Sequence, residues 1–153
     1  MAIERTLAII KPDAYKAGNM GKIISMIEEN GFKIIHARLM KFTEKSAEQF
    51  YEQHKGKPFY ERLINFTVSD KVMAMVLEKE NAIEDFRKLM GDTEPAKAKD
   101  GSIRKLFGRG LPDNAIHGSD SKMAAKREIT YIFGEFASIP SVEKSVAKEY
   151  WAF

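Results

Sequence analysis

The sequence contains no cysteine among its 153 residues, and this absence excludes several kinds of site. A chain without thiols has no disulfide framework, no cysteine-based zinc site and no cysteine nucleophile. Long apolar runs are also missing, so no segment is suited to span a membrane. The first residues place Glu4 and Arg5 inside their apolar stretch, which is not typical of a signal peptide. We therefore expect a cytoplasmic protein that does not contact membranes.

An excess of charge of one sign is missing as well. The 25 basic and 22 acidic residues leave a formal net charge of +3. Such a basic excess can attract nucleic acid, but lysine and arginine alternate with aspartate and glutamate along most of the chain. No basic block with interleaved aromatic residues is present. We therefore do not expect nucleic acid to be a partner.

Two common glycine motifs for binding phosphates are incomplete. Gly18, Gly21 and Lys22 resemble the end of a phosphate-binding loop, but Lys16 stands where that motif requires its first glycine. The stretch 108–110 follows no convincing strand and lacks the third glycine of a dinucleotide-binding motif. If the protein binds phosphates, it must hold them in another way.

The apolar periodicity predicts strands and helices that alternate along one domain. We expect strands at 3–10, 32–42, 72–77 and 115–117, and helices around 23–27, 43–54, 58–63, 81–90 and from Ser119–Ser121 to Phe133. This order favours an α/β or α+β sandwich in which helices cover one face of a small sheet. The domain should span residues 1–153, with 140–153 as a C-terminal extension that ends in Tyr150, Trp151 and Phe153.

Local signals predict where several of these elements begin and end. Thr43 is a suitable N-cap for the helix that follows it, and Asn81 with Glu84 three residues later resembles a capping box. Between 92 and 114 the chain has five glycines or prolines and little periodicity, which indicates a long loop. Loops of that length inside compact domains are usually functional.

The three histidines differ in their sequence surroundings. We expect structural roles for His36, in the middle of a strand, and for His54, on an apolar helical stripe. His117 follows the long loop within a polar cluster that includes Asn114 and Asp120, and the next residue is a glycine that permits a tight turn. An accessible imidazole is expected at this position.

An imidazole at this position can act as a nucleophile toward phosphorus. Its ordinary pKa lies near 6.5, so the neutral ring needs no separate base at pH 7. A carboxylate on the other ring nitrogen would fix the tautomer, and Glu128 on the following helix is the best candidate. Phosphoryl transfer also requires cations and donors around the phosphates, and four residues meet this need: Lys11, Arg87, Thr93 and Arg104.

The stretch 114–120, Asn-Ala-Ile-His-Gly-Ser-Asp, resembles the active-site signature of nucleoside diphosphate kinases. Further segments resemble the same family in the same order along nearly the whole chain. They are residues 6–13 (TLAIIKPD), 51–59 (YEQHKGKPF), 91–95 (GDTEP), 101–104 (GSIR) and 119–133.

The resemblance implies a ferredoxin-like βαββαβ sandwich with a four-stranded antiparallel sheet. It also implies ping-pong transfer of the γ-phosphoryl group of ATP or another nucleoside triphosphate to a nucleoside diphosphate, through phosphohistidine at His117. Mg²⁺ would be the cofactor and would be held through the nucleotide phosphates without a protein ligand. Family members form homo-oligomers, so a tetramer or hexamer is implied.

The resemblance also assigns roles to individual residues. Tyr51 would lie beside His117, and Ser119 and Glu128 would orient it. Phe59 would stack on the base, Leu63 and Leu111 would border it, Lys11 and Asn114 would reach the ribose and nearby phosphate oxygens, and Arg87, Thr93 and Arg104 would hold the phosphates.

Two other functions remain open at this point. A protein of this fold can bind nucleotides without catalysis, because a fold does not fix a function. A ferredoxin-like sheet can also bind single-stranded nucleic acid, although no aromatic pair on a strand supports this alternative.

Overall fold

Four strands form one antiparallel sheet in the computed structural model, which describes residues 2–141. The strands are β1 (Ile3–Ile10), β2 (Lys33–Met40), β3 (Val72–Glu80) and β4 (Ile116–Gly118), in the order β2-β3-β1-β4. β1 pairs along its whole length with β3, and through residues 8–10 with β4. This arrangement confirms the ferredoxin-like sandwich. The aromatic residues expected near the C-terminus lie outside the described part of the chain.

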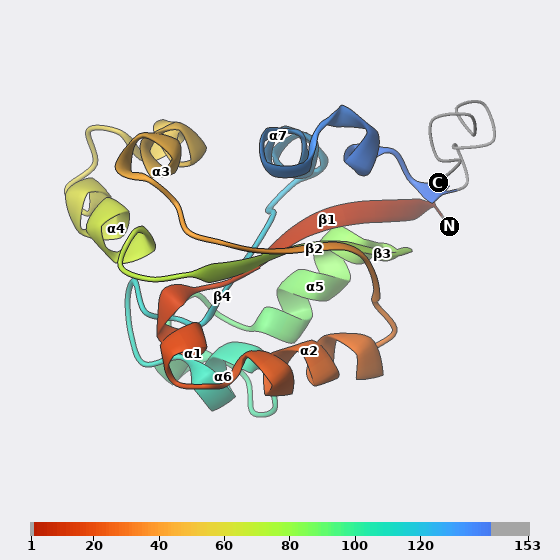
Figure 1. The fold of residues 1–153 in the computed structure, drawn as a ribbon. Helices are drawn as coiled ribbons and strands as arrows, with labels where there is room; N and C mark the ends of the chain where they lie inside the picture. The colour runs from red at the N-terminus through yellow and green to blue at the C-terminus, as the bar shows by residue number, and fades with distance from the viewer. Residues whose placement is uncertain (1, 142–153) are drawn as a thin grey trace.

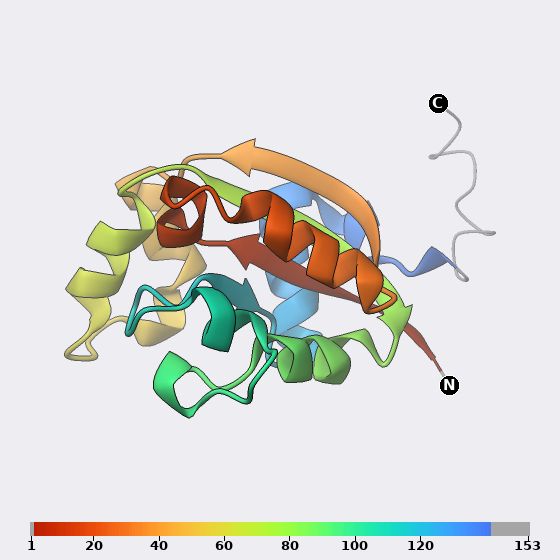
Figure 2. The ribbon, with the colours of Figure 1, turned by 90° about the horizontal axis from the view of Figure 1, so that it is seen from below.

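Helices cover both faces of the sheet (Figure 1). The α-helices are α1 (Pro12–Lys16), α2 (Met20–Glu29), α3 (Glu44–Phe50), α4 (Tyr60–Thr67), α5 (Ala82–Met90), α6 (Ile103–Phe107) and α7 (Lys122–Phe133). Three 3-10 turns accompany them: η1 (Glu52–His54), η2 (Pro95–Lys97) and η3 (Glu135–Ser138). α1, α2, α5 and α6 lie on one side, and Figure 2 views the molecule from this side. α3, α4 and α7 lie on the other, so the expectation of helices on one face was wrong.

The alternation of side chains along the strands explains the two helical layers. Successive residues of a strand point to opposite faces, and every residue of β1 from Arg5 to Ile10 is buried. Leu7 and Ile9 pack in the core beneath α3, α4 and α7, whereas Ala8 and Ile10 pack with α1, α2 and α5. Because both faces of β1 are apolar, each face must pack against its own layer of helices.

The cap predictions have different outcomes. Thr43 caps α3: its hydroxyl accepts the Ser46 N–H at 3.0 Å, and the Ser46 hydroxyl accepts the Thr43 N–H at 2.9 Å. The capping box at Asn81 was wrong, because this residue is left-handed (φ +54°) and its amide donates to carboxylates. The Glu4 carboxylate accepts the N–H of Ile83 in the first turn of α5 instead, at 3.2 Å.

The stretch from 92 to 114 is more ordered than its composition indicates. It contains η2 and α6, and the Ser102 hydroxyl caps α6 by accepting the Lys105 N–H at 3.3 Å. The expectation of one long loop was therefore wrong in part. Helices of three and five residues are too short to produce a periodic apolar pattern.

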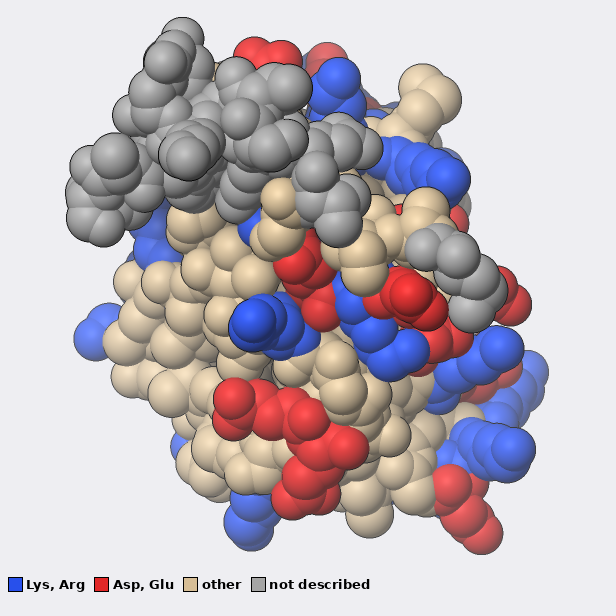
Figure 3. All heavy atoms as spheres, turned by 90° about the vertical axis from the view of Figure 1, so that its right-hand side faces the viewer, with Lys and Arg blue, Asp and Glu red and all other residues tan. Residues whose placement is uncertain are grey.

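The described surface mixes charges of both signs. On the face seen in Figure 3, lysine and arginine side chains alternate with aspartate and glutamate and do not form one continuous patch. No helix in residues 2–141 combines the length and apolar character needed to cross a membrane.

Candidate functional site

A cavity of about 460 Å³ opens beside His117, at the end of β4. Side chains from the end of α3, η1, α5, the following loop, α6 and α7 line it together with β4. The structure brings six of the predicted site residues to this cavity: Tyr51, Arg87, Thr93, Arg104, His117 and Glu128.

The imidazole of His117 is fixed by one of its two nitrogens. Its Nε2 lies 2.8 Å from Oε1 of Glu128, and the Ser119 hydroxyl donates to the same oxygen at 2.9 Å. Ser119 is itself attached to β1, because its hydroxyl accepts the Leu7 N–H at 3.2 Å and its N–H donates to the Leu7 carbonyl at 3.1 Å. No described residue forms a hydrogen bond with Nδ1 of His117. Nδ1 is therefore the ring nitrogen that remains available.

The charge of Glu128 supports one tautomer of His117. Burial alone would raise the pKa of this carboxyl, but the hydrogen bonds from His117 and Ser119 and the nearby Arg127 hold the pKa below its ordinary value. An ionised carboxylate only accepts hydrogen bonds, so it requires a proton on Nε2. Nδ1 of the neutral ring then carries a lone pair.

Arg104 is a buried cation with a fixed orientation. The residue is only 9% exposed, and its guanidinium donates to the carbonyls of Gly91 at 3.1 Å and Ile116 at 2.8 Å. Burial, together with the charge of Arg87, lowers the pKa of Arg104 to about 10, so it remains charged at neutral pH. Its Nε is buried without a partner among the described residues. A donor with this geometry suits an anionic ligand.

Lys11 and Asn114 form a second polar cluster next to the cavity. The Lys11 ammonium donates to Oδ1 of Asn114 at 2.9 Å and to the Pro112 carbonyl at 3.0 Å. The Asn114 amide in turn donates to the carbonyl of Thr93 at 3.0 Å, and Thr93 lines the cavity. Burial and the charge of Arg104 lower the pKa of Lys11 to about 8. Lys11 and Asn114 are therefore connected to the cavity through the backbone of Thr93.

The backbone just before His117 is held in an unusual conformation. Ala115 is fully buried with φ +74°, a region that residues with a Cβ rarely adopt. Its carbonyl accepts the Lys11 N–H at 2.9 Å, and its N–H donates to the Asp13 carboxylate at 3.0 Å. Sequence reasoning missed this role of Asp13, because the contact joins segments that are far apart in the chain.

Three residues expected to contact the base lie outside the cavity lining. Phe59 and Leu111 are 48% and 46% exposed, whereas Leu63 is buried in the core beneath α3, α4 and α7. Phe59 remains connected to the site, because its ring centroid lies 5.4 Å from that of His54.

Tyr51 and His54 approach the cavity from the end of α3 and from η1. The Tyr51 ring lies edge-on to His117 with centroids 6.3 Å apart, and burial and the charge of Glu128 raise the pKa of its hydroxyl. His54 lines the cavity, so the expectation of a purely structural position was incomplete. The sequence contained one signal for this position. His54 follows Tyr51 by three residues, a spacing that places both side chains on one helical face.

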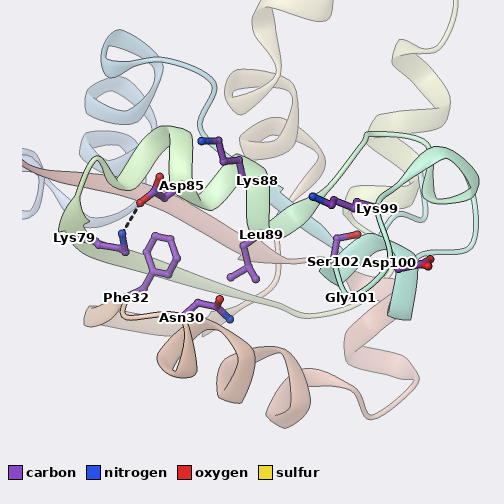
Figure 4. Close-up of a pocket in the computed structure, with 10 residues that line it drawn as sticks. All are labelled: Asn30, Phe32, Lys79, Asp85, Lys88, Leu89, Lys99, Asp100, Gly101 and Ser102. Carbon is purple, nitrogen blue, oxygen red and sulfur yellow. Dashed lines mark hydrogen bonds and ion pairs between the residues drawn. The ribbon is translucent and has the colours of Figure 1, made fainter.

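A second hollow, of about 340 Å³, lies between α2, α5 and α6 (Figure 4). Lys79, Lys88 and Lys99 line it, but the Lys79 ammonium pairs with the Asp85 carboxylate and Asp100 adds a further negative charge. It contains no histidine. The predicted nucleophile and three residues predicted to hold phosphates instead line the cavity beside His117: Arg87, Thr93, Arg104 and His117 itself.

Comparisons with known proteins agree on one family. The family model described as nucleoside diphosphate kinase matches residues 4–137. The nucleoside diphosphate kinase of Glaesserella parasuis is 49% identical over 131 residues, which cover 86% of this chain and 95% of that protein. That of Methanocaldococcus jannaschii is 51% identical over 132 residues, covering 86% of this chain and 94% of that protein.

Solved structures lead to the same result. The nucleoside diphosphate kinase of Aquifex aeolicus superposes with a TM-score of 0.86 at 40% identity, covering 90% of this chain and all of that one. The enzyme of Halobacterium salinarum, solved in complex with CDP, has a TM-score of 0.86 at 34% identity and covers 99% of each chain. The chain therefore belongs to the nucleoside diphosphate kinase family, whose members are phosphotransferases.

Proposed function

We propose that this kinase transfers the γ-phosphoryl group of ATP or another nucleoside triphosphate to a nucleoside diphosphate through His117. One observation carries the proposal: Nδ1 of His117 is free of described partners beside a cavity that contains two arginines, while Nε2 is bound to Glu128. A fixed, neutral imidazole next to cations is suited to attack a phosphate.

The reaction consists of two half-reactions that use the same nitrogen. In the first, the Nδ1 lone pair of His117 bonds to the γ-phosphorus, and the bond to the bridging oxygen breaks. The nucleoside diphosphate leaves with that electron pair. In the second, a terminal oxygen of another nucleoside diphosphate attacks the phosphohistidine, and the N–P bond breaks. Glu128 keeps the Nε2 proton in place throughout and stabilises the positive charge of the phosphorylated ring.

The surrounding residues bind the nucleotide. Arg87, Arg104 and Thr93 offer cations and a hydroxyl to the phosphates, since they line the cavity. We assign the Tyr51 hydroxyl to the phosphoryl group beside His117. Phe59, with Leu63 and Leu111, is the proposed platform for the base, and Lys11 with Asn114 is proposed to reach the ribose.

The carboxylates of the cavity are compatible with Mg²⁺ as cofactor. Asp92 and Asp120 both line the cavity and offer the hard oxygen atoms that this ion prefers. The described residues contain no group of three histidine, aspartate or glutamate side chains that could hold a metal. We therefore propose that Mg²⁺ would be held chiefly by the nucleotide phosphates, with Asp92 and Asp120 as nearby carboxylates, and that it would neutralise phosphate charge.

The proposal includes a homo-oligomer of four or six chains in the cytoplasm. Leu39, on the edge strand β2, is 46% exposed, and an exposed edge of a sheet can be covered by a second copy. Light scattering after size-exclusion chromatography measures the mass of the assembly in solution. A monomeric mass would contradict the proposed homo-oligomer.

Labelling with γ-³²P-ATP and Mg²⁺ tests the central claim. We expect wild type to carry acid-labile, base-stable phosphate that a nucleoside diphosphate removes. His117→Ala should carry none, whereas His54→Gln, which removes the other histidine of the cavity, should still reach full labelling at the end point. If His117→Ala is labelled, the carrier is another residue.

A further inference from the structure

Asp13 is a carboxylate near the nucleotide site that the function proposed above does not use. It lies in the first turn of α1, two residues after Lys11. Its Oδ2 accepts the N–H of Ala115 at 3.0 Å, whereas its Oδ1 is buried without a hydrogen-bond partner among the described residues. A buried carboxylate oxygen that no donor contacts is costly, so a compensating positive charge is expected nearby.

The contact with Ala115 fixes a strained turn at the start of β4, the strand that carries the proposed nucleophile. The Ile116 N–H donates to the Asn114 carbonyl at 2.9 Å across Ala115, whose φ is +74°. A hydrogen bond of this span is typical of a γ-turn, which is rare and strained when its central residue has a positive φ. Such strain persists only where the surroundings fix the backbone, and the Asp13 carboxylate does so at the Ala115 N–H.

The Lys11 ammonium lies against the same short segment of chain. It donates to Oδ1 of Asn114 at 2.9 Å and to the Pro112 carbonyl at 3.0 Å. The backbone N–H of Lys11 donates to the Ala115 carbonyl at 2.9 Å. The ammonium of Lys11 and the carboxylate of Asp13 are therefore both bound to residues 112–115. Lys11 is buried, and opposite charges interact strongly where water is excluded.

Each of these two charges supports the ionised form of the other. Burial and the charge of Arg104 lower the pKa of Lys11, and two carboxylates oppose this effect, Asp13 first and Asp113 second. These are the charged groups that face Lys11 from α1, from α6 and from the segment before β4. Burial raises the pKa of Asp13, and the charge of Lys11 is the main opposing effect.

We propose that Asp13 is a positioning residue of the nucleotide site, which holds the Ala115 peptide in its strained turn and stabilises the charge of the Lys11 ammonium. The proposal rests on the proposed function, because it needs Lys11 and Asn114 to reach the ribose of a bound nucleotide. Asp13 itself does not touch the nucleotide in this scheme, since its Oδ1 is buried and its Oδ2 is bound to Ala115.

The dependence of KM on pH tests the effect of the charge. Asp13→Asn removes the charge but keeps an oxygen that can accept the Ala115 N–H. We expect KM for a nucleoside diphosphate to rise at lower pH than in wild type, to be about threefold higher at pH 8 and to be nearly unchanged at pH 6. Asp113→Asn is the matched control, because it removes another carboxylate that faces Lys11 but leaves the Ala115 contact in place. It should shift the KM profile in the same direction by a smaller amount.

Rapid-quench measurement of phosphoenzyme formation at pH 6 and saturating ATP tests the backbone contact, because Lys11 is charged there in every variant. Asp13→Ala removes the acceptor as well as the charge, so the turn before His117 can relax. The first-order rate should fall about tenfold, which is typical of losing a hydrogen bond to a charged group. Asp13→Asn should stay within about threefold of wild type. If Asp13→Ala does not fold, Asp13→Ser, whose side chain is also too short for this contact, takes its place.

The proposal is overturned if Asp13→Asn retains the wild-type dependence of KM on pH, or if Asp13→Ala forms the phosphoenzyme at the wild-type rate. A residue that only stabilises the fold would change KM by the same factor at every pH, so that outcome would also overturn it. A wild type that carries no phosphate on histidine would instead contradict the proposed function itself.

Discussion

The two sides of the cavity beside His117 differ in burial and in the partners of their polar groups. On the inner wall, formed by Arg104, His117, Ser119 and Glu128, every residue except His117 is at most 9% exposed. These side chains bond to one another or to backbone carbonyls. The outer rim, formed by His54, Lys57 and Phe59, contains a Phe59 side chain that is 48% exposed.

This difference separates residues that are fixed in place on the inner wall from residues on the rim that solvent and ligands can reach. Buried polar groups must satisfy their hydrogen bonds inside the protein, which fixes them before substrate arrives. Exposed groups on the rim can move as nucleotides enter and leave. We therefore expect inner-wall substitutions to affect both stability and chemistry, and rim substitutions to affect mainly binding or a single step.

Glu128→Ala should produce the largest effect of the substitutions that leave His117 in place. It removes the acceptor that holds Nε2 and leaves the Ser119 hydroxyl without this partner. Loss of such an orienting carboxylate typically costs 10- to 100-fold, so we expect kcat/KM in a coupled assay to fall about 100-fold. Glu128→Gln, which keeps one accepting oxygen, should lose less. Equal activity of Glu128→Ala and wild type would show that the inner wall does not orient His117.

Arg104→Lys tests whether geometry or charge matters on the inner wall. A lysine keeps the charge but cannot donate to the Gly91 and Ile116 carbonyls with one planar group. We expect kcat/KM to fall about 30-fold and stability to urea to fall by about 2 kcal/mol. Arg87→Lys is the matched control, because Arg87 lines the same cavity but is exposed. Similar losses for the two variants would contradict the distinction between fixed and mobile cations.

The parts that were predictable from sequence are those with local signals. The strand at 3–10 was predicted with its observed bounds, because its residues form one apolar segment that a proline ends. Thr43 was recognisable as a cap because a cap acts on backbone within three residues, and the start of the last helix was correctly expected within Ser119–Ser121. Motif order was also sufficient to group the residues that meet at His117.

Other features depend on contacts between distant segments. The Glu4 carboxylate reaches the first turn of α5, and Asp13 holds the left-handed Ala115, over separations of 79 and 102 residues. The buried orientation of Arg104 depends on two backbone carbonyls, which any residue type could provide. A single sequence contains no local signal for such pairings, so burial and tautomers could be assigned only once the fold was known.

The pH dependence of Lys11 should differ in sign between binding and stability. Its pKa in the folded protein is about 8, compared with an ordinary value of 10.5, so between these values the unfolded chain holds more protons. The free energy of unfolding should therefore rise as the pH increases from about 8 toward 10.5. Nucleotide affinity should fall over the same window, because the ammonium is lost.

Urea unfolding and KM for a nucleoside diphosphate, both measured from pH 7 to 10, check this expectation. We expect KM to rise about tenfold, which corresponds to the loss of one charge-assisted contact. Lys11→Met should reduce the pH dependence of both the free energy of unfolding and KM. A KM that stays constant in wild type while stability rises would mean that the Lys11 ammonium does not contribute to nucleotide binding.

Phe59→Ala should produce the smallest effect and should be confined to binding. The ring is half exposed outside the core, so its removal creates no cavity, and unfolding in urea should change by less than about 0.5 kcal/mol. Loss of a stacking surface should raise KM about fivefold, the lower end for base stacking, with kcat nearly unchanged. Phe59→Tyr keeps the ring and should restore KM. A fall in kcat with an unchanged KM would contradict the proposed role of this ring as a platform for the base.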